Sequence, residues 1–228
     1  MFKNIYKKNI ENCKQDILAL TKKDEDSVML DCGCWNGEFT LQLMEKISPK
    51  KAIGIEIVGK AAKEARKKGI TVYQADLNNG LKLRNNSADI VIANQIIEHL
   101  HNTDFFISEI YRVLKPGGYA IISTNNLAAW HNIFSLLFGK QPFPADVSNN
   151  YSRVGTFFKP IKATPSWTHM RIFTASSLKQ ICRLYGFKIE EVIGTGYYPF
   201  FGFIAKFFAN LDKKHAAYLT IKIRKAEK

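Results

Sequence analysis

The sequence predicts an α/β fold in which a parallel sheet is flanked by helices. From Ser27 to about Thr124, short runs rich in β-branched residues alternate with amphipathic segments of helical length. Glycine or proline stands where several of these helical segments end. Strands that alternate with helices along a chain are typical of a parallel sheet, because each parallel crossover needs a long connection.

The composition describes one compact domain with a substantial core. The chain has 228 residues, of which 46% are apolar and 23% are charged. These values exclude disordered, collagen-like and coiled-coil chains. The longest apolar stretch, residues 197–208, is interrupted by Pro199, Gly202 and Lys206. It is shorter than the ~20 residues that span a bilayer, so no transmembrane helix is expected.

Five strands are predicted in the first part of the chain, each a short run dominated by β-formers. They are residues 28–31, 52–57, 70–73, 90–93 and 119–123. The segments 38–47, 60–68 and 103–114 between them are expected to be helices. Gly69 ends the second helix. Lys115-Pro-Gly-Gly118 ends the third, because proline cannot continue a helix and glycine tolerates left-handed backbone.

The regular alternation breaks after Asn125. Residues 127–138 are mostly apolar and are expected to form a buried or substrate-facing helix that ends at Gly139. Segment 140–167 contains Pro142, Pro144, Pro160 and Pro165 and predicts a long loop or lid, a kind of segment that is usually functional. A last unit follows, with a helix at 175–185 between the N-cap Thr174 and the stop Gly186, a strand at 187–193, an aromatic segment, and a strand at 216–224.

Charge and cysteine content bear on partners and location. The first twenty residues carry charges in every turn and lack the apolar core of a signal peptide, so a cytoplasmic protein is expected. The four cysteines, Cys13, Cys32, Cys34 and Cys182, are too irregularly spaced for a disulfide framework or a structural zinc site, so no metal is expected. The net charge of +13 attracts nucleic acid, anionic lipid or acidic metabolites, although the scattered basic residues equally fit a solvated surface.

Candidate binding residues follow the first three predicted strands. Asp31-Cys-Gly-Cys-Trp-Asn-Gly37 ends a strand and opens a helix, and its glycines let backbone approach a ligand. Glu56 lies about twenty residues further on, where a carboxylate can accept hydrogen bonds from ribose hydroxyls. Asp76 follows the third strand and can accept a hydrogen bond from an adenine amino group. Each acid alone fits an ordinary surface residue, but three at successive strand ends favour a nucleoside site.

This ordered series resembles the class I S-adenosylmethionine-dependent methyltransferases, in particular the type 11, ubiquinone-biosynthesis-like group that acts on small molecules. The resemblance is carried by Asp31-x-Gly33-x-x-x-Gly37, Glu56, Asp76, Asn94-Gln-Ile-Ile-Glu-His-Leu100 and Arg112-Val-Leu-Lys-Pro-Gly-Gly118. It implies a Rossmann-like, seven-stranded, mostly parallel sheet in the order 3-2-1-4-5-7-6, with strand 7 antiparallel. Helices on both faces and an aromatic cap complete the implied fold.

The resemblance also implies a single methyltransferase domain over residues 1–228. Its expected parts are an N-terminal helical segment (1–26), a cofactor-binding core (27–125), a cap or lid insertion (126–170) and the C-terminal part of the sheet (171–228). The implied cofactor is S-adenosyl-L-methionine. The residues implied to bind it are Asp31, Gly33, Cys34, Gly37, Glu56, Ile57, Asp76, Leu77 and Asn94. Trp35 stands where the family more often has glycine, so its side chain either covers the cofactor or points away.

Methyl transfer from a sulfonium is an in-line displacement, and a base is needed only if the acceptor must lose a proton. The candidates for that base are His99, His131 and His169, each of which also fits an ordinary hydrogen-bonded histidine. The catalytic residue therefore stays open at this point.

Aromatic residues in the cap and the C-terminal segment favour a small aromatic or lipophilic acceptor, with an anionic group suggested by the basic charge. They equally fit a cap that closes its own core. They are Trp130, Phe134, Phe138, Phe143, Tyr151, Phe157, Phe158, Trp167, Tyr197, Tyr198, Phe200, Phe201, Phe203, Phe207 and Phe208. Residues 200–211 could also contact a membrane surface.

Two other functions stay open. RNA methylation is less favoured, because Asn94-Gln-Ile-Ile97 lacks the Asn-Pro-Pro-Tyr arrangement of related base amino methyltransferases and no Pro-Cys pair is present. A catalytically silent subunit that binds S-adenosylmethionine for regulation or assembly is the other alternative. The oligomeric state is open.

Overall fold

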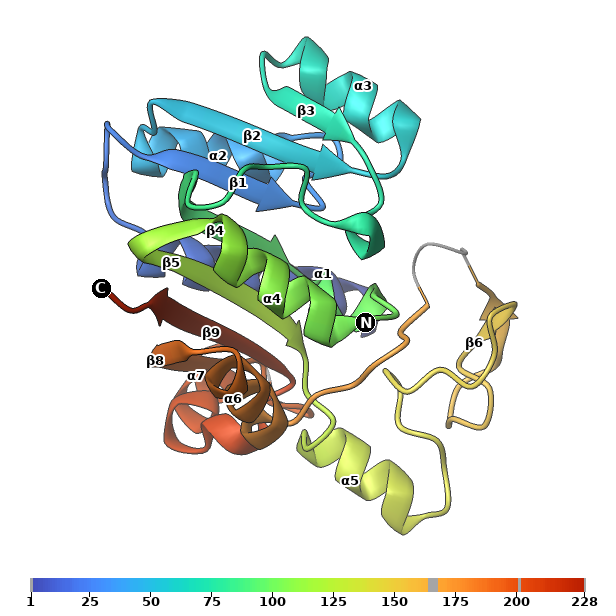
Figure 1. Ribbon diagram of the computed structural model, residues 1–228. Helices are drawn as coiled ribbons and strands as arrows, with labels where there is room; N and C mark the ends of the chain where they lie inside the picture. Colours follow the sequence, from blue (N-terminus) through green and yellow to red (C-terminus); the bar gives the residue numbers. More distant parts are fainter. Residues whose placement is uncertain (1, 164–167, 201, 228) are drawn as a thin grey trace.

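The computed structural model describes residues 2–163, 168–200 and 202–227. One large sheet forms its centre, with strands in the order β3-β2-β1-β4-β5-β9-β8 (Figure 1). The strands are β1 (Val28–Cys32), β2 (Lys51–Glu56), β3 (Thr71–Gln74), β4 (Ala88–Asn94), β5 (Leu114–Asn125), β8 (Phe187–Thr195) and β9 (Tyr218–Lys225). Since β8 and β9 are the sixth and seventh strands of this sheet, the predicted order is confirmed.

The register places the carboxyl ends of five parallel strands, β1 to β5, at one edge. In the centre, Asp31 of β1 lies opposite Gly54 of β2 and Ile92 of β4. β3 pairs parallel with β2, and β5 pairs parallel with β4. Within this sheet, β9 runs antiparallel to its neighbours β5 and β8. Open α/β sheets bind ligands at such a carboxyl edge, next to the point where the strand order reverses.

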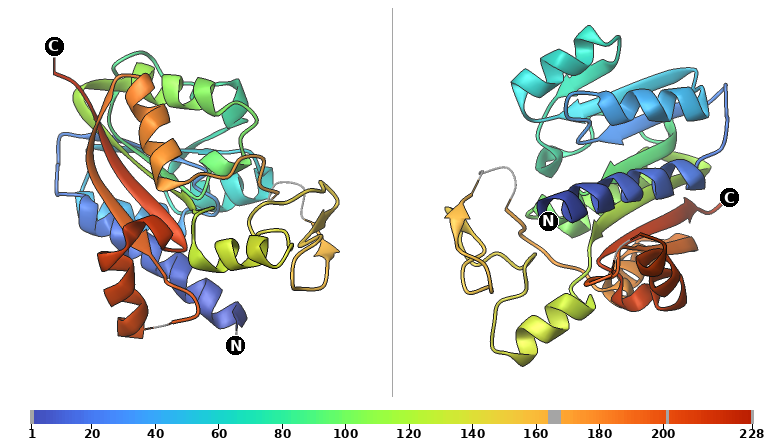
Figure 2. Two further views of the ribbon diagram at one scale, coloured as in Figure 1. Left: turned by 90° about the horizontal axis from the view of Figure 1, so that it is seen from below. Right: turned by 180° about the vertical axis from the view of Figure 1, so that it is seen from behind.

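Helices cover both faces of the sheet (Figure 2). The helices of the core are α1 (Phe2–Leu20), α2 (Glu38–Ile47), α3 (Gly59–Lys67), α4 (Thr103–Val113) and α6 (Ala175–Leu184). Side chains of β4 alternate between two apolar clusters, as successive residues of a strand must. Ile90 and Ile92 pack with α1 and α2 on one face, whereas Val91 and Ala93 pack with α4 and α6 on the other.

Predicted and observed boundaries differ most at β5. The helix before it ends at Val113, and β5 begins at Leu114, five positions before the expected start. The Pro-Gly-Gly segment therefore lies within the strand, where the pairing with β4 shifts register between Ala88 and Ile90. Gly117 has a φ of 77°, a left-handed conformation that glycine tolerates best.

The cap, residues 126–170, leaves the sheet at the end of β5 and projects from the body (Figures 1 and 2). It contains α5 (Trp130–Leu137) and the short hairpin of β6 (Tyr151–Ser152) and β7 (Ile161–Lys162). Asn126 bridges to Phe173, so the segment returns to the sheet beside its point of departure. Pro165 and Trp167 lie outside the described residues.

Residues 127–138 were expected to form a buried or a substrate-facing helix, and the first of these expectations is wrong. Only Asn132 of α5 is buried, while Phe134, Leu136 and Leu137 are exposed. The helix has more apolar side chains than its contacts with the rest of the protein can bury. One edge is held by Trp130, whose Nε1–H donates to the Tyr197 hydroxyl at 2.6 Å.

The aromatic segment after β8 contains a helix that the sequence analysis did not name. α7 (Gly202–Leu211) buries Ala205 and Ala209 and exposes Phe203, Phe207 and Leu211. A short 3-10 helix, η4 (Lys213–His215), leads into β9. Phe201 lies outside the described residues. Within the described ranges, no helix combines the length and apolar content needed to cross a membrane.

Candidate functional site

A cavity of about 600 Å³ opens along the carboxyl edge of the sheet. Its wall is built by the ends of β1, β2 and β4, by the loops that follow them, and by α1. Within the described part of the chain, its lining carries five carboxylates and one lysine, Lys14. The cavity is therefore locally acidic in a protein whose net charge is +13.

The turn after β1 brings backbone close to the cavity. Gly33 has a φ of 75°, and its N–H donates to the Ile55 carbonyl at 2.8 Å. A Cβ at this position would lie 2.1 Å from Cδ1 of Ile96. Any other residue here would adopt strained backbone and would have to displace the Ile96 side chain.

Asp31 presents a buried carboxylate at the end of β1. It is 3% exposed, and its Oδ2 accepts the Thr40 hydroxyl at 2.6 Å. Burial raises the pKa of Asp31 to about 6; the Thr40 hydrogen bond opposes this rise and Glu56 adds to it. The side chain is thus a charge that a cationic ligand would stabilise.

Glu56, at the end of β2, is held by two backbone amides. Its Oε2 accepts the N–H of Trp35 at 2.9 Å, and its Oε1 accepts the N–H of Val58 at 2.8 Å. Each oxygen retains a further lone pair. Trp35 itself has left-handed backbone (φ 48°) and a 46% exposed side chain among the residues that line the cavity. The open question about Trp35 is thus answered in part, since its side chain stays at the cavity.

Asp76 is the N-cap of the 3-10 helix η1 (Leu77–Asn79). Its Oδ1 accepts the backbone N–H of Asn78 at 2.8 Å and the side-chain amide of the same residue at 2.9 Å. On the other side, Oδ1 of Asn94 accepts the Ser123 hydroxyl at 2.7 Å, which ties the end of β4 to β5. Both polar groups are therefore fixed before any ligand binds.

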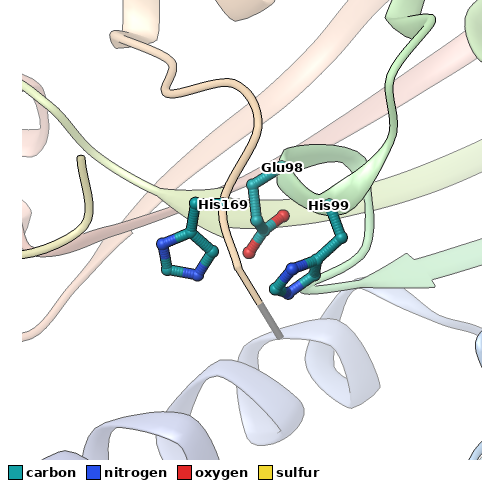
Figure 3. Close-up of side chains that lie close together, drawn as sticks. All are labelled: Glu98, His99 and His169. Carbon is teal, nitrogen blue, oxygen red and sulfur yellow. The ribbon is translucent and has the colours of Figure 1, made fainter. Parts of the chain in front are cut away.

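A second group of polar side chains lies beyond Asn94. Glu98 and His99 come from the 3-10 helix η2 (Ile97–His99), and His169 comes from the end of the cap (Figure 3). Burial raises the pKa of Glu98 to about 7 and lowers the pKa of both histidines. The imidazoles are therefore held in their neutral form.

The structure brings together eight of the nine residues implied to bind the cofactor. Asp31, Gly33, Cys34, Glu56, Ile57, Asp76, Leu77 and Asn94 all line the cavity, as do His99 and His169. Gly37 does not line it. It is the N-cap of α2, where a Cβ would meet Ile70 and Ala65. His131 lies elsewhere, against the Tyr198 ring, and burial lowers its pKa to about 4.

The cap aromatics do not form the expected acceptor lining. Among the described residues, the aromatic side chains of the cavity wall other than histidine are Tyr6, Trp35 and Phe39. Phe138 instead packs against Phe157, and Phe143 against Phe158. The alternative, a cap that closes on its own side chains, describes these contacts better.

Three wall residues come from α1, a helix to which the sequence analysis gave no role in the site. They are Tyr6, Ile10 and Lys14. Their spacing of four residues puts them on one helix face, and that spacing was the available signal. Nothing in the sequence placed that face at the sheet edge.

Comparison with known proteins identifies the fold and the domain. Residues 30–122 match the type 11 family model described as a methyltransferase domain. Residues 30–122 of this chain are therefore similar to a type 11 methyltransferase domain. The match covers β1 to β5, the segment that builds most of the cavity wall.

The methyltransferase domain has curated relatives of low identity. The mitochondrial ubiquinone biosynthesis O-methyltransferase of Rattus norvegicus is 27% identical over 184 residues, which cover 77% of this chain and 48% of the relative. The malonyl-[acyl-carrier protein] O-methyltransferase of Marinomonas sp. is 28% identical over 127 residues, covering 54% and 47%. The chain spans about half the length of these curated relatives.

Solved structures support the same fold. The S-adenosylmethionine-dependent methyltransferase of Mesorhizobium loti has a TM-score of 0.64 at 17% identity, covering 93% of this chain and 98% of that one. A methyltransferase of Archaeoglobus fulgidus that depends on the same cofactor also gives 0.64, at 19% identity, covering 95% and 94%.

S-adenosylmethionine is the cofactor of this methyltransferase family. The cavity fits it in three respects. Its volume lies within the roughly 300–1,000 Å³ of small-molecule sites. Gly33 brings the backbone of the turn after β1 to the cavity wall, where a side chain would collide with Ile96. Finally, buried carboxylates suit a ligand that carries a sulfonium and an ammonium group.

Proposed function

We propose that the protein is a methyltransferase that uses S-adenosylmethionine to methylate a small acceptor. The observation that supports this most strongly is that Asp31, Glu56 and Asp76, from the ends of three adjacent strands, line one cavity. When bound, the cofactor supplies a methyl group already activated on a sulfonium. The chain's own task is to align the acceptor with that group and to exclude water.

The proposed roles of the residues follow from their fixed geometry. Glu56 holds the ribose hydroxyls with the lone pairs that Trp35 and Val58 leave available. Asp76 and Leu77 border the adenine. Asp31, Gly33, Cys34 and Asn94 surround the methionine end, with Ile57 beside the ribose. Since hydrogen bonds hold Asp31, Glu56, Asp76 and Asn94 in advance, little side-chain entropy is lost on binding.

The acceptor is proposed to enter between α1 and the end of the cap. Tyr6, His99 and His169 line the same cavity as the acids of β1 and β2. Such a lining suits a small molecule with an apolar ring or chain and one polar group. If the acceptor must lose a proton, His99 and His169 are neutral imidazoles within the same space.

The test is transfer of a labelled methyl group from S-adenosylmethionine into a cell extract by the purified chain. Label in the small-molecule fraction supports the proposal. Label that appears only in RNA, and disappears when nucleic acid is removed, supports the RNA alternative. Tight binding of the cofactor without transfer to any fraction supports the silent-subunit alternative.

A peripheral membrane contact remains a proposal for the partner surface. It is supported by α7, whose Phe203, Phe207 and Leu211 are exposed at helical spacing beside Lys206. Binding to vesicles that contain anionic lipid, compared with uncharged vesicles, tests it. Retention on neither kind of vesicle rejects the contact.

A further inference from the structure

Glu98, His99 and His169 point toward one another at the acceptor end of the cavity (Figure 3). One potential ligand atom from each lies within 4.8 Å of the other two. The two histidine ring centroids are 4.9 Å apart, and the Glu98 carboxylate lies between the rings. The cluster joins η2 to a cap residue that is distant in sequence.

Each imidazole uses one nitrogen in the same way. Nδ1 of His99 lies 3.0 Å from the Thr168 carbonyl, and Nδ1 of His169 lies 2.8 Å from the Pro144 carbonyl. A carbonyl oxygen only accepts, so Nδ1 carries the proton in both rings and Nε2 carries a lone pair. On His169 this lone pair faces the Asn125 amide nitrogen at 3.4 Å, a contact that a metal ion would replace. A backbone carbonyl that fixes the tautomer in this way is the usual support of a metal-binding histidine.

Glu98 supplies the third potential ligand. Its side chain is fully buried, and Oε2 has no hydrogen-bond partner among the described residues. Oε1 accepts the Asn125 amide at 3.3 Å. A buried carboxylate oxygen without a donor is costly unless a cation compensates it.

Backbone hydrogen bonds join the two segments that carry the cluster. The Glu98 carbonyl accepts the N–H groups of Met170 at 2.7 Å and of Arg171 at 3.1 Å. His169 is therefore held next to η2 by main-chain hydrogen bonds, in addition to the contacts of its ring with Pro144 and Asn125. Ligands at 2.0–2.2 Å around a tetrahedral ion are about 3.4 Å apart, so inward movements of about 1 Å complete the site.

We propose that Glu98, His99 and His169 bind a divalent ion of the Zn²⁺ type. Two neutral imidazoles and one carboxylate suit zinc better than magnesium or calcium, which prefer oxygen ligands. Three protein ligands leave a coordination position open toward the cavity, as in catalytic rather than structural zinc sites. This departs from the expectation of a metal-free protein.

The role of the ion rests on the proposed function. The cavity has five carboxylates and one lysine, so a negatively charged acceptor oxygen would be repelled there without a cation. The ion binds that oxygen and lowers the pKa of its hydroxyl, whose proton leaves to solvent. An oxygen lone pair then forms the new bond to the methyl carbon, while the sulfur–carbon bond breaks and its electron pair stays on sulfur. The acceptor class is therefore an acidic hydroxyl compound or a carboxylic acid.

Metal binding is measured directly, with Zn²⁺ in calorimetry and Co²⁺ as a visible spectroscopic probe on the full chain. We expect one equivalent to bind, and His99→Gln and His169→Gln each to weaken binding by about tenfold or more. His101→Asn is the matched control, because His101 is exposed and lies outside the cluster. Equal binding by all four proteins, or no binding by the unaltered chain, overturns the proposal.

A second measurement covers variants that fail to fold. X-ray absorption of the Zn²⁺-loaded unaltered chain is expected to give nitrogen and oxygen ligands at about 2.0–2.2 Å and no sulfur. Sulfur ligands would place the ion at a cysteine and reject the site. Calorimetry with S-adenosylhomocysteine distinguishes failure of the metal site from failure of the proposed function. If the chain binds S-adenosylhomocysteine but not Zn²⁺, only the metal site is rejected. If it binds neither, the proposed function is rejected as well.

Discussion

The Glu56 carboxylate at the end of β2 accepts the backbone N–H of Trp35 in the turn after β1, at 2.9 Å. One residue therefore both shapes the turn and faces the cavity. Because the same carboxylate accepts the N–H of Val58, it also fixes the start of α3. A change at Glu56 acts on three neighbouring segments at once.

Glu56→Gln is predicted to weaken binding of S-adenosylhomocysteine by tenfold to about 100-fold. Glutamine offers one acceptor oxygen in place of two, so one backbone donor or one ribose hydroxyl loses its partner, at about 1–3 kcal/mol. Calorimetry measures the affinity. Glu64→Gln on the exposed face of α3 is the control and leaves it unchanged. Equal affinities of both variants would remove Glu56 from the site.

Gly33→Ala is predicted to lower the free energy of unfolding by more than Gly69→Ala does. Both glycines have positive φ, so both variants share a backbone strain of about 1–3 kcal/mol. Only the Cβ at position 33 meets another atom, Cδ1 of Ile96, whereas nothing lies within 4 Å at position 69. Denaturant unfolding measures the difference, and adding Ile96→Ala is expected to recover part of it. Identical losses at both glycines contradict the close approach.

Asp31 is predicted to make stability depend on pH between about 4 and 6. Its pKa is about 6 in the folded protein and about 3.9 in an unfolded chain, so the folded state binds the proton more tightly. The stabilisation is fully present below about pH 4 and is lost as the pH rises through about 6, a change of about 3 kcal/mol.

The measurement compares the free energy of unfolding of the unaltered chain with that of Asp31→Asn across this range. Asparagine keeps an oxygen for the Thr40 hydroxyl but does not titrate. As the pH rises from 4 to 7, the unaltered chain is expected to lose unfolding free energy relative to Asp31→Asn. A constant difference from pH 4 to 7 contradicts the raised pKa.

Tyr197→Phe is predicted to loosen the cap without changing cofactor affinity. The Tyr197 hydroxyl accepts from Trp130 at 2.6 Å and donates to Asp212 at 2.8 Å, linking α5 to the segment after α7. Its loss removes one hydrogen bond from each group, while Trp130 Nε1 still lies 3.3 Å from Asp212, so the cost is about 0.5–1.5 kcal/mol. Limited proteolysis within residues 126–163 reports the effect, with Tyr151→Phe in the exposed hairpin as control. Unchanged cleavage shows that this link does not hold the cap.

The strands of the sheet were predicted well because residues close together in the sequence mark where each strand begins and ends. Glycine stops and β-branched runs delimited β1 to β4, and the family resemblance supplied the order of β8 and β9. The three acids also came together as expected, since the carboxyl ends of neighbouring parallel strands must meet. Gly37 differed, because its place in the glycine pattern serves the start of α2 rather than the cavity.

The other parts of the site depended on long-range contacts. His99 and His131 were both candidates in sequence, yet only His99 lies beside His169, because the cap returns to η2. Glu98 was passed over, since nothing local marks a carboxylate as buried. Apolar content suggested a buried α5, but burial depends on the area offered by neighbours, and the cap offers α5 little.

The bridge between Asn126 and Phe173 has an evolutionary consequence. Because the cap starts and ends at adjacent points of the sheet, the strands that form the cofactor cavity would stay connected in the same order without it. Recombination of a single gene segment can therefore replace the cap by the cap of a related protein. New acceptor chemistry can arise in this way while the sheet and its cofactor stay as they were.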